Sequence, residues 1–195
     1  MIEVRTAELK DIPALVEIHQ RRFSSFFLTT LGTTFLRVFY TAFLKFPGIL
    51  LVLTKQNKIE GFAAGSLDNK GFFKKLLSNN LLGFMKAGII LVFTNPLAIK
   101  RLGTNAGKSE KATLEYSELL SIATNKNNEG FGRILLEAFE LDVLKNQKRK
   151  LPISLTTDFD NNEKAVTFYK EAGYDVYEVF FSYNDRKMYR FIKNI

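Results

Sequence analysis

The segment that most constrains the fold is ELLSIATNKNNEGFGRILLEAFE, residues 118–140. It runs from a strand-like apolar stretch through a short polar loop into Gly-x-Gly, and then into an amphipathic helix. The start of a helix has free backbone N–H groups and the positive end of the helix dipole, so it can bind an anion. Gly130 and Gly132 carry no side chain that would keep the backbone away from a phosphate, and Arg133 can add charge. The pattern predicts a strand, an anion-binding loop and a helix, with a plain tight turn as the alternative.

Other phosphate-binding and catalytic classes do not fit this sequence. A dinucleotide-binding fingerprint needs a third glycine, and Leu135 stands at its position. A P-loop needs Gly-Lys-Ser/Thr after the glycines, and that sequence does not follow. The chain has no Cys and one His, which excludes a disulfide framework, zinc–thiolate sites and a Cys nucleophile, and argues against a His-based metal site or a Ser/His/Asp triad. We therefore expect no metal.

The rest of the chain alternates strand and helix patterns around this segment. Strands are predicted over 2–6, 49–54, 58–66, 113–123 and 153–156, with a C-terminal hairpin of 174–183 and 187–192 around Asn184-Asp185. Helices are predicted over 12–23, 33–44, 71–102 with a break near Asn95-Pro96, 130–145 and 162–172. The helix 130–145 is expected to bury the stripe Phe131, Ile134, Leu135, Ala138, Leu141 and Leu144. Asp11 and Asn162 are the expected N-caps, and Gly173 the expected stop of the last helix. The order predicts one α/β (α+β) domain over residues 1–195, a mixed sheet with helices on both faces.

A second segment, DFDNNEKAVTFYKEAGYDV at residues 158–176, closely resembles the second helix motif of the GNAT superfamily of N-acetyltransferases. The matching residues are Asn162, Ala165, Phe168, Tyr169 and Gly173-Tyr174. Asn127-x-x-Gly130-x-Gly132 is similar to the pyrophosphate loop of that superfamily, and residues 118–124 to its central strand. The resemblance covers 118–174 and is absent over 68–111. It implies a GNAT-like, mostly antiparallel central sheet with a helical insert, residues 67–111, between the third and fourth strands.

The resemblance also implies a mechanism, in which a primary amine attacks the thioester of acetyl-CoA directly. Tyr169 would protonate the leaving thiolate, because a phenol with a pKa of ~10 keeps its proton at pH 7; simple packing in the helix is the alternative. Glu118 is the candidate base. In a regular strand it shares a face with Tyr116, Leu120 and Ile122, and a carboxylate on an apolar face has a raised pKa; the alternative is a partly solvated residue paired with a Lys. The residues expected to bind acetyl-CoA are Ile122, Ala123, Thr124, Asn127, Asn128, Gly130, Phe131, Gly132, Arg133 and Asn162.

The acceptor is expected to be a small molecule. His19, on the apolar face of the first helix, is either a core residue or part of the acceptor pocket, and the same alternatives hold for Phe26 and Phe27. A similarity of the Phe-rich start to acetyltransferases associated with surface-sugar biosynthesis suggests an amino sugar. A protein or peptide N-acetyltransferase and a catalytically degenerate CoA-binding regulatory module are the alternatives.

The net charge of +8 is concentrated in the insert, because residues 67–111 contain eight Lys/Arg and two acidic residues. A basic insert on a near-neutral domain argues against a nucleic-acid partner. The uncharged run 87–99 is shorter than the ~20 residues that span a bilayer. We expect the insert to cover the acceptor pocket and to attract an anionic acceptor. A membrane-surface role for 71–102 is the less favoured interpretation, and a homodimer is left open. The start of the sequence has no apolar signal region, which predicts a cytoplasmic protein.

Overall fold

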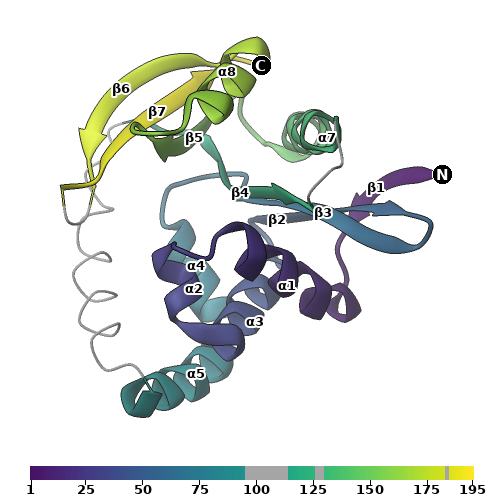
Figure 1. Ribbon diagram of the computed structural model, residues 1–195, viewed down its shortest axis with the longest axis vertical. Helices are drawn as coiled ribbons and strands as arrows, with labels where there is room; N and C mark the ends of the chain where they lie inside the picture. Colours follow the sequence, from purple (N-terminus) through teal and green to yellow (C-terminus); the bar gives the residue numbers. More distant parts are fainter. Residues whose placement is uncertain (95–113, 126–129, 183–184) are drawn as a thin grey trace.

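The computed structural model describes residues 1–94, 114–125, 130–182 and 185–195, with side chains up to residue 88 in the first range. Within these residues the strands form one sheet in the order β1-β2-β3-β4-β5-β7-β6 (Figure 1). The strands are β1 (Ile2–Thr6), β2 (Gly48–Lys55), β3 (Lys58–Ser66), β4 (Ser117–Thr124), β5 (Ile153–Asp158), β6 (Asp175–Phe181) and β7 (Lys187–Lys193). Neighbouring strands are antiparallel except β4 and β5, which are parallel. The predicted mixed, mostly antiparallel sheet is confirmed.

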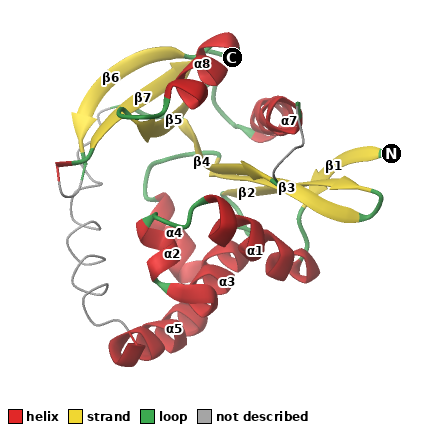
Figure 2. Cartoon of the chain, in the orientation of Figure 1, coloured by secondary structure: helices red, strands yellow, loops and turns green. Residues whose placement is uncertain are grey.

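Helices cover both faces of this sheet (Figure 2). On one face lie the single turn η1 (Leu9–Asp11) and the helices α1 (Ile12–Arg22), α2 (Phe27–Thr30), α3 (Gly32–Ala42), α4 (Phe72–Asn79) and α5 (Leu81–Thr94). On the other face lie α7 (Phe131–Asn146) and α8 (Glu163–Glu171). The predicted arrangement of helices on both faces is therefore found.

Each face of the sheet has its own apolar core. The first core, under α1 and α3, is built around Leu15, Leu36, Tyr40, Val52 and Phe62. The second core, under α7 and α8, is built around Leu53, Leu135, Phe139, Leu155 and Phe191. Because alternate residues of a strand point to opposite faces, the core to which a residue belongs tells which face it occupies.

The buried face of α7 differs from the predicted stripe. The helix buries Phe131, Leu135, Leu136, Phe139 and Val143, whereas Ile134, Leu141 and Leu144 are exposed. Apolar residues surround much of α7, so its sequence alone leaves the choice of face open. Gly65 of β3 decides it, because a Cβ at that position would lie 2.6 Å from the Phe139 ring. The missing side chain at residue 65 makes the space that the Phe139 ring fills.

Two predicted helix caps have another role. Asp11 and Asn162 stand at the N-cap positions of α1 and α8, but neither side chain makes a capping hydrogen bond. Asp11 instead accepts two hydrogen bonds from the Arg5 guanidinium, at 2.7 and 2.9 Å. The Asn162 amide donates to Thr157 Oγ1 and to the carbonyl of Asp158. Each residue thus ties the start of its helix to a strand of the sheet. Gly173 ends α8 as predicted, with a φ of +85°.

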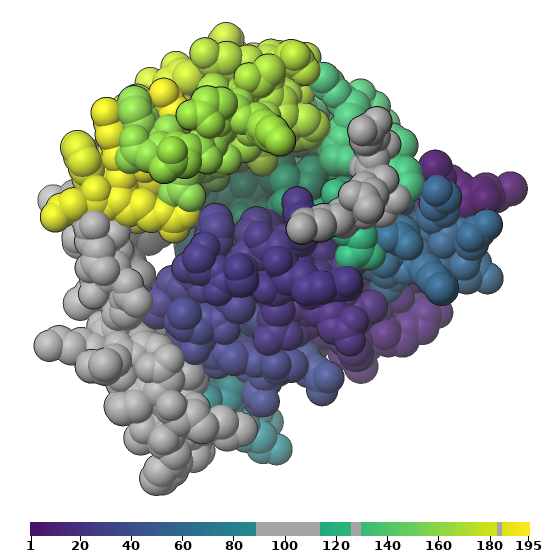
Figure 3. All heavy atoms as spheres, viewed as in Figure 1, coloured from purple at the N-terminus to yellow at the C-terminus, as the bar shows by residue number. Residues whose placement is uncertain are grey.

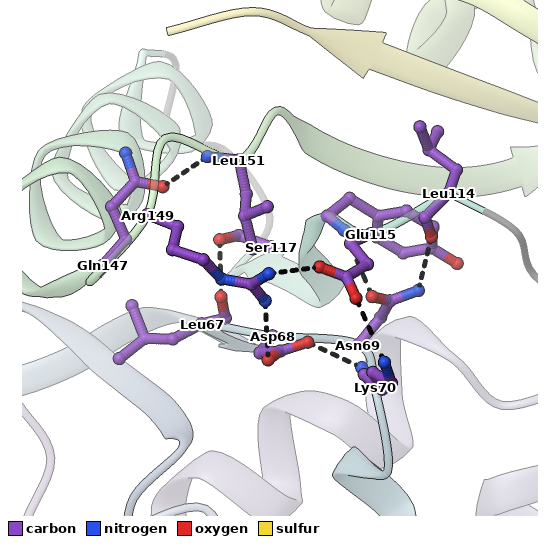
Figure 4. A network of polar contacts seen from close by, with 11 residues as sticks. Leu67, Asp68, Asn69, Lys70, Leu114, Glu115, Ser117, Gln147, Arg149 and Leu151 are labelled. Atoms are coloured by element: carbon purple, nitrogen blue, oxygen red, sulfur yellow. Dashed lines mark hydrogen bonds and ion pairs between the residues drawn. The ribbon is translucent and has the colours of Figure 1, made fainter.

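The insert begins and ends at a closed polar stem (Figure 4). Asn69 and Tyr116 continue the pairing of β3 with β4: the Asn69 N–H donates to the Tyr116 carbonyl at 2.9 Å, and the Tyr116 N–H to Asn69 Oδ1 at 3.1 Å. Arg149, from the loop after α7, pairs with Glu115 at 2.6 Å and with Asp68 at 3.7 Å. The two ends of the insert are therefore fixed to each other and to the α7–β5 loop.

The described part of the insert packs on α3. The Phe72 ring of α4 lies 5.4 Å from that of Phe43, and the Phe84 ring of α5 lies 5.8 Å from that of Phe35. The helical pattern predicted as one unit breaks at Asn80, whose side-chain amide donates to the carbonyl of Val38 in α3. The break predicted near Asn95-Pro96 lies outside the described residues.

Candidate active site

The sheet opens between β4 and β5. These two strands pair over three positions only, from Ser117 with Ile153 to Leu119 with Leu155. Beyond these positions β4 stays paired with β3, and β5 with β7. The last residues of β4 and β5 therefore diverge, and each leaves backbone groups toward the opening. Figure 3 shows a recess between the yellow-green atoms of α8, β6 and β7 and the purple atoms of the N-terminal helices.

A β-bulge in β4 decides which side chains face which core. The register of β3 with β4 shifts between Ala64 and Gly65, so that β4 has one extra residue, Leu120. Glu118 precedes the bulge and faces the first core. Past the bulge Ile122 faces the second core, so the prediction that Glu118 and Ile122 share a face is wrong. The cores show the change, because the first takes Leu120 and Ala123 and the second takes Leu119 and Ile122.

Glu118 lies in a row of polar residues across three strands. Its register partners are Ser66 on β3 and Ser154 on β5. Directly opposed residues of neighbouring strands share a face, so both serines lie on the same face of the sheet as Glu118. Both serines are fully buried, and their hydroxyls have no hydrogen-bond partner among the described residues. No sequence pattern indicates this row, because strand register alone creates it.

Burial raises the pKa of the Glu118 carboxyl to about 7, and the positive charge of Arg190 opposes part of that rise. Arg190, on β7, is held in place by two hydrogen bonds: Nε donates to Glu178 Oε1 at 2.7 Å and Nη1 to Tyr116 Oη at 2.8 Å. Its guanidinium also lies 5.2 Å from the centre of the Phe180 ring. At neutral pH the carboxyl of Glu118 is thus near half-ionised, which suits a group that accepts a proton. Arg190 is a further site residue that sequence reasoning missed.

Tyr169 lies on the opposite face of the sheet, in α8. Its ring packs against Phe168, Tyr174 and Phe191 of the second core, with centroid distances of 5.1, 6.0 and 5.9 Å. Burial raises the pKa of its phenol to about 12, so the hydroxyl keeps its proton at neutral pH. Within the described residues that hydroxyl makes no hydrogen bond. Tyr169 is therefore both a packed residue and a protonated phenol with a free donor, so its two predicted roles are compatible.

The start of α7 is open. Gly130 stands at the N-cap with a φ of +85°, and a Cβ there would meet no atom within 4 Å. The first N–H groups of a helix have no acceptor inside the helix, so an anion could approach them here. A Cβ on Gly132 would lie 3.7 Å from the ring of Phe168, which brings this turn beside α8. The predicted loop residues Asn127 and Asn128 lie outside the described residues.

Two cations lie near this turn. Arg133, which the sequence predicts to add charge to the loop, donates from Nη1 to the carbonyl of Glu171, at the end of α8, over 3.3 Å, and its role toward the cofactor stays a prediction. Lys55, at the end of β2, has its Nζ 5.7 Å from the centre of the Phe131 ring in the first turn of α7. Among the described residues, Lys55 is thus a basic side chain that lies beside the start of α7. It is far away in the sequence, and only the β2–β3 hairpin brings it there.

On the acceptor side, His19 behaves as a core residue. It is buried, its Nδ1 lies 2.6 Å from Tyr40 Oη, and burial lowers its pKa to about 4. Phe27 packs on the first core. Phe26 is more exposed, and the guanidinium of Arg186, the residue before β7, lies 4.7 Å from the centre of its ring. Phe26 therefore connects the start of α2 with the residue before β7, whereas His19 and Phe27 belong to the packing.

The expected cover over the acceptor pocket is not formed by the described part of the insert. α4 and α5 pack on α3, and Figure 1 shows α5 at the far end of the molecule from α8. Residues 95–111, including Lys100 and Arg101, lie outside the described residues. No group of three or more His, Asp or Glu residues that could hold a metal ion occurs in the part of the chain that the structure describes.

Solved structures with the same arrangement are acetyltransferases. An acetyltransferase crystal structure superposes with a TM-score of 0.67 at 17% identity, covering 99% of each chain. Ard1 from Thermoplasma volcanium gives 0.62 at 16% identity, covering 100% of this chain and 97% of the other. A GNAT-family acetyltransferase from Bacillus cereus gives 0.60 at 13% identity, covering 100% and 97%. This chain has the GNAT fold. No protein-family model and no curated protein matches the sequence.

At identities this low, the superpositions show a shared GNAT fold and nothing about the activity. The resemblance found in residues 118–174 and the GNAT fold of the whole chain agree, although they rest on different observations. Among the described helices, none is long and apolar enough to cross a bilayer.

Proposed function

We propose that this protein is an acetyl-CoA-dependent N-acetyltransferase that transfers an acetyl group to a primary amine of a small molecule by direct attack. The observation that carries the proposal is the opening between β4 and β5, with Glu118 on one face of the sheet and Tyr169 on the other. A thioester in that opening would have a proton acceptor on the side where the amine arrives. It would have a proton donor on the side where the thiolate leaves.

The residues around the opening fit acetyl-CoA. Its phosphates would bind the free N–H groups at the start of α7, with Lys55 nearby. Its extended arm could bond to the backbone of β4 beyond Leu119, where β5 no longer pairs with that strand. The cofactor would supply the thioester carbon that the amine attacks. Of the other predicted contacts, Asn162 already binds the end of β5, and its role toward the cofactor stays a prediction.

Glu118 accepts the proton that the amine must lose. Its pKa of about 7 lets it take up a proton and release it to solvent at neutral pH. Tyr169 has the complementary role. Its phenol, with a pKa of about 12, is a weaker acid than a thiol with a pKa of ~8.5. We therefore expect Tyr169 to stabilise the developing thiolate mainly by donating a hydrogen bond.

The acceptor class is proposed from the recess. Phe26 and Phe180 supply apolar ring surface beside Arg186 and Arg190, whose guanidinium groups pair with Asp158 and Glu178. Apolar rings beside paired charges suit a small polar amine, and an amino sugar is the first class to test. Structures with this fold include one named an aminoglycoside 6'-acetyltransferase and one named a ribosomal-protein-S18-alanine N-acetyltransferase. A protein or peptide amine is therefore the enzymatic alternative.

The test is turnover with acetyl-CoA and a panel of amino sugars, aminoglycosides, amino acids and short peptides, detected as release of the CoA thiol. Calorimetric binding of CoA is measured in parallel. The proposal expects CoA binding and thiol release with at least one small amine. Binding without turnover on any amine would favour a CoA-binding regulatory module. Absence of CoA binding would contradict the enzyme and the module alike.

A further inference from the structure

The helices α4 and α5 have two apolar faces, and only one of them is packed. Phe72, Leu76 and Ala87 are buried in the first core. On the other side, Phe73, Leu77, Leu81, Leu82 and Met85 are 45%, 47%, 56%, 73% and 56% exposed. We name these five residues the outer face. Phe73 and Leu77 lie four residues apart on α4, and Leu81 and Met85 lie four residues apart on α5, so each pair lies on one face of its own helix.

The charged side chains around the outer face are basic. Lys74, Lys75 and Lys86 are exposed on the same two helices. In the sequence, residues 71–109 contain six Lys/Arg and no Asp or Glu. Outside residues 67–111 the chain carries 20 basic and 18 acidic residues, from 28 − 8 and 20 − 2. The positive charge of the molecule is therefore concentrated on the same segment as the exposed apolar side chains.

These two properties discriminate between the surfaces that could cover the outer face. A second copy docking through the same face would bring like charges together, which costs free energy. An apolar protein partner would leave the lysines without a role. An anionic lipid surface satisfies both, because apolar side chains enter the headgroup boundary while lysine stems extend to the phosphates. Each lysine near such a surface contributes about 1 kcal/mol.

We propose that the outer face docks the protein onto an anionic lipid bilayer. The attachment is peripheral: the described helices include none that could span a bilayer. Figure 1 places α5 at one end of the longest axis of the molecule and α8 at the other. The α5 part of the outer face therefore lies away from α8. The inference is independent of the proposed acetyltransferase activity.

The test is co-sedimentation of the whole chain with lipid vesicles. The vesicles are phosphatidylcholine alone, or phosphatidylcholine with about one quarter phosphatidylglycerol. Each is used at about 50 mM and about 500 mM salt, because screening by salt separates charge from apolar insertion. One variant reverses three charges, Lys74→Glu, Lys75→Glu and Lys86→Glu. A second carries Leu81→Asp and Leu82→Asp, which lie in the first turn of α5, where acidic residues favour the helix.

Matched controls come from the far side of the molecule. A triple variant, Lys145→Glu, Lys148→Glu and Lys150→Glu, changes the same net charge on the exposed end of α7 and the following loop. A double variant, Leu141→Asp and Leu144→Asp, removes the same number of exposed leucines from α7. Circular dichroism and thermal melting check that every variant is folded.

We expect binding to the anionic vesicles at low salt, little binding to phosphatidylcholine alone, and a loss of about tenfold or more in each outer-face variant. The controls should bind like the unmodified chain. Three results would overturn the proposal: an unmodified chain that stays in the supernatant with anionic vesicles, controls that lose as much binding as the outer-face variants, or a dimer that Leu81→Asp and Leu82→Asp convert to a monomer without changing vesicle binding.

Discussion

At residue 118 the fold holds a carboxyl group whose ionisation costs free energy. The pKa of Glu118 rises from 4.5 to about 7 because the half-buried side chain has lost much of its contact with water. Well below pH 4.5 the group is protonated in both the folded and the unfolded chain and costs nothing. Between pH 4.5 and about 7 the unfolded chain releases the proton while the folded chain keeps it, so stability falls over that window and levels off above it. Glu118→Gln removes this loss. We expect the free energy of unfolding of the variant to exceed that of the unmodified chain by about 1–3 kcal/mol at pH 8, and the two to be almost equal at pH 4.5.

Urea unfolding at several pH values measures this difference. The same substitution should remove the rising limb of the kcat/KM profile, whose apparent pKa we expect near the value of about 7 for Glu118. Glu137→Gln on the exposed side of α7 is the control. If the unmodified chain and Glu118→Gln lose stability in parallel between pH 4.5 and 8, the carboxyl of residue 118 is not the buried acid described above.

The packing role and the catalytic role of Tyr169 can be tested separately. Its ring is packed, whereas its hydroxyl makes no hydrogen bond within the described residues. Tyr169→Phe keeps the ring contacts with Phe191 and Tyr174. We expect kcat to fall roughly 10- to 100-fold, with CoA affinity and thermal stability almost unchanged. Tyr189→Phe, on β7, is the control. An unchanged kcat in Tyr169→Phe would leave the residue with its packing role alone.

At the scale of elements, the start of α7 can be tested against the start of α4. Gly130 and Gly71 are both N-cap residues in the left-handed region, with φ of +85° and +66°, and a Cβ on either would meet no atom within 4 Å. An alanine at either position should therefore cost a similar backbone strain of about 1–2 kcal/mol. Only Gly130→Ala should also weaken acetyl-CoA binding, by about tenfold or more, because its Cβ obstructs the phosphates.

Calorimetry on Gly130→Ala and Gly71→Ala measures that contrast. Equal CoA affinities in the two variants would show that the phosphates bind elsewhere. The comparison controls for the strain itself, because both substitutions impose it at the N-cap residue of a helix.

The sequence predicted which segments form helices and which form strands. It did not predict which side of α7 is buried or which face of the sheet the end of β4 presents to each core. Alternating and helical patterns predicted the hairpin of β2 with β3 and the helices α1, α3, α7 and α8. The face of α7 depends on the space above Gly65, and the face of Ile122 depends on the extra residue Leu120 in β4. Both are contacts with a neighbouring strand, and no pattern within one element records them. The Ser66–Glu118–Ser154 row escaped prediction for the same reason.

At the scale of the molecule, the short pairing of β4 with β5 divides the sheet. β1 to β4 form one part and β5, β7 and β6 the other, and three residue pairs join them. The resemblance in residues 118–174 predicted the cofactor strand, the loop and Tyr169, because those lie close together along the chain. Lys55, Arg190 and the two serines come from other strands, and only the assembled sheet brings Lys55 to the start of α7 and the other three near Glu118.

A ligand in that opening would join the two parts of the sheet, which gives the last prediction. Acetyl-CoA at 100 times its Kd should stabilise the folded chain by about 2.7 kcal/mol, a rise in Tm of roughly 5–10 °C for a domain of this size. CoA should act similarly, and NAD and ATP should not. A thermal shift shows binding alone, so hydrogen exchange is measured on the same samples.

If the arm of the cofactor bonds to β4, the amides of residues 121–124 and 156–158 should gain protection together, because they face the opening from its two sides. The amides of β1 and β2 are the internal reference. A rise in Tm with no added protection in these two segments would place the cofactor outside the opening. That result would remove the reason for assigning Glu118 and Tyr169 to opposite sides of the thioester.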